Sequence, residues 1–200
     1  MGLALATAAS QAMLLGTEVG QTALVDQWER TALAFGQDVD DARYAQFQAL
    51  SRNGPVYGMA MAVVGGPLLT AAVATLIFVV FRGRSGGGVS YSQVLSVMAH
   101  ASVILAIRQL VAAPVSFARE TISSATSLGV WFPTLDQASP LARFVGAVDV
   151  FVIWWVVLVA LGVAVLYERQ ARRLAAAFLG VYAGVALLLA ATMTALGGTA

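Results

Sequence analysis

The sequence contains no cysteine and no lysine, and its only histidine is His100. The absence of cysteine excludes disulfides, thiolate metal sites and cysteine nucleophiles. The absence of lysine excludes Schiff-base chemistry and the lysine of a phosphate-binding P-loop, because both require the ε-amine. A single histidine without acidic neighbours supplies too few donors for a zinc site. We therefore expect no metal and no cofactor.

Charge is also scarce. Charged residues make up 10% of the 200 residues, against about a quarter in soluble domains, whereas 60% are hydrophobic and the mean hydropathy is +0.83. The composition predicts one all-α integral membrane domain over residues 1–200, surrounded by membrane lipids. A formal net charge of +1 offers nothing to nucleic acid.

Apolar windows of about 20 residues are the length that crosses a bilayer as a helix. Five are expected as spans, at about residues 2–24, 56–81, 93–117, 145–167 and 174–197. The first is the weakest, because alanine and other small residues dominate it, and the bundle has four spans if it does not cross. Pro67, after Gly65-Gly66, removes a helix hydrogen bond and predicts a kink in the second span.

Arginine placement predicts the orientation of this bundle. The two short connectors between spans carry Arg82 and Arg84 in one case and Arg169, Arg172 and Arg173 in the other. The positive-inside rule places both in the cytoplasm. With five spans, this puts the N-terminus in the cytoplasm and the C-terminus outside. An excess of arginine, alanine, glycine and valine is typical of a high-GC bacterial genome, so we expect a bacterial inner (plasma) membrane.

The glycine-rich connector 82–92 superficially suggests a phosphate cradle. It has no preceding soluble strand, no GK[ST] motif and no acid for magnesium. We interpret it as a flexible tether, with Ser90 or Ser92 starting the next helix.

The outer connectors, residues 25–55 and 118–144, are not plain loops. In the first, apolar residues recur at helical spacing (Leu24, Trp28, Ala32 and Phe35), and Asp40 or Asp41 can cap a short second helix. This predicts a periplasmic amphipathic helical hairpin. It either covers the bundle or docks another subunit, and its candidate partner contacts are Trp28, Phe35, Tyr44 and Phe47.

The third and fourth spans each contain charge that hydrocarbon does not tolerate. One face of the third span carries Gln93, Ser96, His100, Ile104 and Arg108, so this face must point into the bundle. Asp149 lies near the outer end of the fourth span. We predict an ion pair between Arg108 and Asp149 that fixes helix register. A proton relay is the weaker alternative because no chain of acids or histidines accompanies the pair.

Two further arrangements are weighed in the same way. A Ser-His-Asp triad from Ser96 or Ser102, His100 and Asp149 is disfavoured, because His100 and Asp149 lie toward opposite membrane faces. In the last span Ala176, Gly180 and Gly184 form a strip of small residues that allows close helix contact. Packing within the bundle is the favoured use of this strip, and contact with a partner membrane protein is the other.

Two segments resemble the bacterial Yip-domain proteins. Asp149-Val-Phe151-Val-Ile-Trp154, followed by a second tryptophan and VVLVALGVAV, is similar to their D-x-F-x-x-W…L…G stretch. Gln93-Val-Leu-Ser-Val-Met-Ala-His-Ala-Ser is similar to their Q-V-L-x-V-x-A-x-A-S segment. The resemblance covers about residues 56–197, and the N-terminal region departs from it by lacking a longer basic segment before the first span.

The resemblance implies a five-span bundle without enzymatic activity and an accessory or adaptor role. The high-GC composition and the outer hairpin favour a LucB-type accessory component of mycobacterial Mce lipid importers, whose partner is the permease of the importer. The alternative is a small-solute or ion channel or transporter working as a homo-oligomer, although the sequence shows one polar stripe and no internal repeat. An enzyme would need a converging nucleophile, base and metal ligands, and the sequence shows none.

Overall fold

The computed structural model describes residues 2–83, 88–119, 125–132, 134–135 and 139–196. It is 84% helix, and the described residues form no strand. The helices are α1 Gly2–Leu15, α2 Glu18–Ala34, α3 Asp41–Ser51, α4 Gly54–Ala60, η1 Met61–Gly65, α5 Gly66–Arg82, α6 Tyr91–Ala101, α7 Val103–Ala118, η2 Leu128–Trp131, α8 Pro140–Ala147, α9 Val150–Leu166 and α10 Ala171–Leu196.

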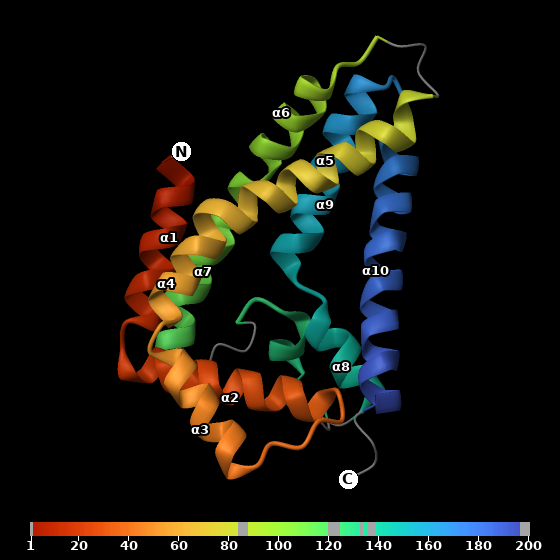
Figure 1. The fold of residues 1–200 in the computed structure, drawn as a ribbon. Coiled ribbons are helices and arrows are strands. Elements are labelled where there is room, and N and C mark those ends of the chain that lie inside the picture. The colour runs from red at the N-terminus through yellow and green to blue at the C-terminus, as the bar shows by residue number, and fades with distance from the viewer. Residues whose placement is uncertain (1, 84–87, 120–124, 133, 136–138, 197–200) are drawn as a thin grey trace.

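Within the described residues, three helical stretches are long and apolar enough to cross a membrane, as expected of a multi-pass membrane protein. They run over Gly54–Arg82, Tyr91–Ala118 and Ala171–Leu196. The fourth apolar helix, α9, has 17 residues, which at 1.5 Å per residue is about 25 Å, against about 30 Å for a typical hydrocarbon core. Figure 1 shows α9 lying between α10 and the pair α5 and α6.

The N-terminal region differs from the single helix expected over residues 2–24. α1 ends at Leu15, and Thr17 starts α2 in a new direction by accepting a hydrogen bond from the Gly20 N–H at 3.0 Å. α1 packs against α4 and α7, whereas α2 lies across one end of the bundle with α3 beneath it (Figure 1). The 14 residues of α1 extend only about 21 Å.

The second span bends through a π-helical turn at η1, between α4 and α5. The Gly66 N–H bonds to the Met61 carbonyl, five residues back. Pro67 follows at once and has no N–H to continue the α-helical ladder, which accounts for the wider turn at this place.

The region expected as one span over residues 145–167 is two helices. α8 ends at Ala147, Val148 and Asp149 are extended, and α9 begins at Val150. Asp149 caps α9 by accepting hydrogen bonds from the N–H groups of Phe151 and Val152, at 2.9 and 3.3 Å. Asp149 thus lies at the start of the helix and not several residues within it, because a capping carboxylate favours a helix start.

The hydrophobic core lies where α5, α6 and α9 meet near their connecting loops. Its buried members are Ala74, Ile77, Val94, Met98, Ala101, Val159, Val163 and Tyr167. Gly162 lets α9 approach α6 closely, since a Cβ there would lie 2.4 Å from Cγ1 of Val97. At the start of α6, Ser90 and Gln93 form a reciprocal capping box, so Ser90 is the cap rather than Ser92.

Candidate functional site

Asp149 is the centre of a polar junction at the start of α9. Nε of Arg108, from α7, lies 2.7 Å from Oδ2 of Asp149, and the Thr126 hydroxyl donates to the same oxygen. The Asp149 side chain is 7% exposed and that of Arg108 is 31% exposed. Together with the two capping N–H groups on Oδ1, both carboxylate oxygens are occupied by donors, an arrangement that holds elements together.

Backbone and tyrosine contacts close the same junction. The Leu128 N–H donates to the Val148 carbonyl at 2.8 Å, and the Val150 N–H donates to the Thr126 carbonyl at 3.2 Å. The Tyr182 hydroxyl, on α10, accepts from the Asp149 N–H at 3.0 Å and donates to the Ala147 carbonyl at 3.2 Å. Elements from four parts of the chain therefore meet within one hydrogen-bonded network.

Thr126 and Tyr182 are absent from the sequence-based site. Tyr182 left a signal, because a tyrosine inside an apolar span needs a partner for its hydroxyl. Thr126 left none, because its position depends on how the connector folds.

The remaining residues of the polar stripe take no part in this junction. Nδ1 of His100 lies 2.7 Å from the Ser96 carbonyl oxygen of its own helix, and the side chain is exposed. Within the described residues no group of three or more histidine, aspartate or glutamate side chains is placed to hold a metal ion.

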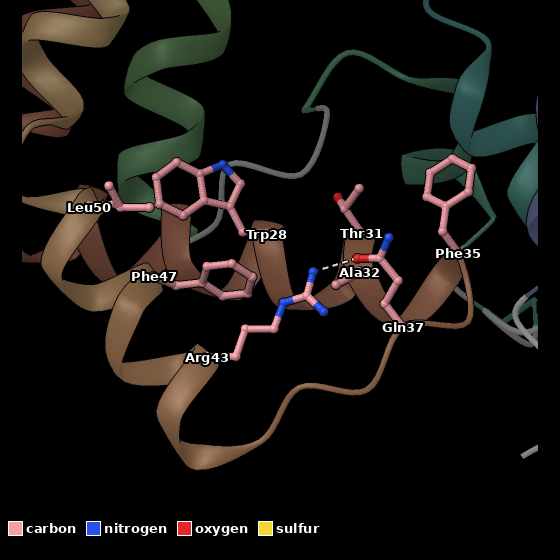
Figure 2. A pocket seen from close by; sticks show the side chains of 8 residues that line it. All are labelled: Trp28, Thr31, Ala32, Phe35, Gln37, Arg43, Phe47 and Leu50. Atoms are coloured by element: carbon pink, nitrogen blue, oxygen red, sulfur yellow. Dashed lines mark hydrogen bonds between the residues drawn. The ribbon is translucent and has the colours of Figure 1, made fainter.

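The helical hairpin α2–α3 holds an apolar groove (Figure 2). Its volume is about 390 Å³, and it is lined by Trp28, Thr31, Ala32, Phe35, Gln37, Arg43, Phe47 and Leu50. The rings of Trp28 and Phe47 meet edge to face at 5.9 Å between centroids. The Arg43 guanidinium lies 5.7 Å from the Phe47 ring centre and is tied to Gln37 and the Asp38 carbonyl.

The structure brings three of the four predicted hairpin contacts, Trp28, Phe35 and Phe47, into this groove. Tyr44 lies elsewhere, in a second groove of about 290 Å³ lined mostly by polar residues, including Glu18 and Arg52. The two grooves divide the hairpin into an apolar and a polar surface.

The small-residue strip of α10 is open. A Cβ added at Gly180 or Gly184 would meet no atom within 4 Å, and Ala176 is exposed as well. The strip therefore does not pack within the bundle, contrary to the favoured expectation. Of the aromatic residues after Asp149, Phe151 is half-buried and Trp154 is 50% exposed, with their ring centroids 6.5 Å apart.

The chain was compared with protein families, curated proteins and solved structures. The model of a family described as the Yip1 domain matches residues 1–193, so it includes α1 and the hairpin as well as the later spans. No curated protein and no solved structure matches.

Proposed function

Since the chain belongs to the Yip1 domain family, a membrane protein family not known as enzymes, we propose that it is a non-enzymatic accessory protein of a larger membrane complex. The observation that carries this proposal is the apolar groove of the hairpin, where three aromatic side chains from two helices and their connector line a concave surface. Aromatic anchors in such pockets supply most of the binding energy of protein interfaces.

The complex we propose is an envelope lipid-transport system of the Mce type, and the partner is its permease. The arginine-rich, lysine-free composition and an extramembrane helical hairpin support this assignment. By the positive-inside rule, Arg82, Arg169 and the N-terminal arginines of α10 mark the cytoplasmic end of the bundle in a bacterial plasma membrane. With α1 as the first span, the N-terminus is then cytoplasmic, and the hairpin and the C-terminus are outside. Arg84 lies outside the described residues.

In this proposal the Arg108–Asp149 ion pair has a structural role, which is to hold α7 and the start of α9 in register. The support is the saturation of the Asp149 carboxylate by donors from α7, the connector and α9 itself. The open Gly180 and Gly184 strip is a second place where a transmembrane helix of the partner could approach closely.

Affinity purification of the tagged protein from its native membranes, followed by quantitative mass spectrometry, tests the proposal. We expect a permease and its associated subunits at fixed stoichiometry. Recovery of the protein alone, or only as a homo-oligomer, would refute the accessory role and favour a self-contained channel or transporter.

A further inference from the structure

The charge around the hairpin groove indicates which kind of partner segment binds there. This inference rests on the proposed accessory role. We propose that the groove receives an amphipathic helical segment of a membrane-protein partner, with apolar side chains on one face and arginine or lysine beside them. Recognition of a helix by an apolar groove between helices is a recurrent mode of binding.

The groove itself selects apolar anchors. Five of its eight lining residues are apolar, and the Trp28 and Phe47 rings pack against each other to form a stiff wall. The volume of about 390 Å³ is at the lower end of the range of pockets that bury a ligand. It accommodates a few large side chains and no whole domain, so the groove serves as an anchoring point within a larger interface.

The surroundings of the groove select positive charge. Residues 18–55, which contain the hairpin, hold six acidic residues and three arginines, a net charge of −3. Among the residues that the structure describes, no ion pair neutralises a hairpin carboxylate. Asp38 and Asp41 are exposed near the end of the groove that holds Gln37 and Arg43. Such uncompensated charge attracts and orients a cationic partner.

The same charges disfavour a lipid as the occupant. Bacterial and other plasma-membrane headgroups carry phosphate and are often anionic, and the acidic hairpin repels them. Among the described residues that line the groove, Arg43 is the cation. It already donates to Gln37 and to the Asp38 carbonyl and lies against the Phe47 ring. A phosphate would have to displace these contacts.

A binding assay with defined peptides tests the inference on the full-length protein in nanodiscs of phosphatidylcholine. The probes are a fluorescent 18-residue helix with leucine on one face and arginine beside it, and the same helix with glutamate in place of arginine. Fluorescence anisotropy should show at least tenfold tighter binding of the arginine helix, with empty nanodiscs as the blank. Equal binding of the two helices, or preference for the glutamate helix, would overturn the charge argument.

Two matched pairs of variants locate the binding. Phe35→Ala should weaken binding of the arginine helix about tenfold, whereas Tyr44→Ala, on the polar groove, should leave it unchanged. Asp38→Asn should weaken it several-fold and flatten its salt dependence. The control Glu18→Gln removes the same charge on the polar groove and should have a smaller effect. Equal effects within either pair would place the binding outside the groove and refute the inference.

A crosslinking experiment in native membranes separates this inference from the proposed function. Photoreactive benzoylphenylalanine at position 35 should crosslink to an apolar and basic segment of the co-purifying membrane protein, and the same group at position 44 should not. If a partner co-purifies but crosslinks from position 44 alone, the accessory role stands and the groove inference fails. Crosslinking of position 35 to phospholipid would replace the protein segment by a lipid and also overturn it.

Discussion

Gly162 offers the sharpest test of how α9 packs against α6. In Gly162→Ala the added Cβ would lie 2.4 Å from Cγ1 and 3.1 Å from Cγ2 of Val97, whereas carbon atoms prefer about 3.5–4.0 Å. Val97 is β-branched and stiff at χ1, so it cannot swing its methyl groups away. The helices must therefore separate.

The size of the effect follows from a matched control. Gly180→Ala adds the same methyl group within a helix but meets no atom within 4 Å, so both variants gain about 1 kcal/mol in helix propensity. Only Gly162→Ala also incurs overpacking, which costs about 1–3 kcal/mol. The difference between the two free energies of unfolding should therefore be about 1–3 kcal/mol.

Thermal unfolding in detergent, followed by intrinsic tryptophan fluorescence, measures this difference. For a chain of this length, Gly162→Ala should melt about 2–12 °C below Gly180→Ala, since each kcal/mol shifts Tm by about 2–4 °C. Val97→Ala should rescue Gly162→Ala in a double-mutant cycle. Equal stability of the two glycine variants, or no rescue, would refute the close α6–α9 contact.

Three further predictions concern hydrogen bonds, and the same melting assay checks each. Arg108→Ala and Asp149→Ala should each lower the free energy of unfolding by about 1.5–3 kcal/mol, and Asp149→Ala should have the larger effect because it also removes the cap of α9. The double variant should lose less stability than the sum of the two single variants. Additive losses would refute the pairing. Tyr182→Phe should cost about 0.5–1.5 kcal/mol for its lost bonds to the α8–α9 junction, and wild-type stability would show that α10 is not held there. Ser90→Ala should cost about 1 kcal/mol and Ser92→Ala clearly less, and the reverse order would assign the cap to the wrong serine.

The sequence predicts the membrane class and the isolated charges better than it predicts where helices begin. Arg108 and Asp149 stand out because each is a charge within apolar sequence that needs a partner, and the structure places them 2.7 Å apart. From hydropathy alone we predict one span where the structure has two helices, α8 and α9, although Asp149 is also a strong helix cap. Hydropathy likewise predicts one helix across α1 and the start of α2. Thr17 followed by Glu18 is a helix-start signal, but the surrounding apolar run obscures it.

The groove shows the same division between local pattern and tertiary contact. The spacing of Trp28, Ala32 and Phe35 predicts one helical face, because residues three and four apart share a side. That Phe47 and Arg43 complete the groove depends on how α3 folds back on α2, which no local pattern specifies. The openness of Gly180 and Gly184 was equally hidden, because a small-residue strip has the same sequence whether a neighbour covers it or not.

The π-helical turn at Met61–Gly65 allows one span to contact α1 before the turn and the α6–α9 core after it. Each residue turns an α-helix by about 100°, so an inserted residue rotates the face that follows by that angle. Before the turn, Gly58 faces α1, where its Cβ position lies 3.1 Å from Cδ1 of Leu15; after it, Ala74 and Ile77 join the core with α6 and α9. Deleting one residue from this turn would rotate Gly58 by about 100° relative to Ala74 and Ile77, and so away from α1. The extra residue of this turn therefore sets the rotation of the N-terminal helix and its attached hairpin relative to the bundle core.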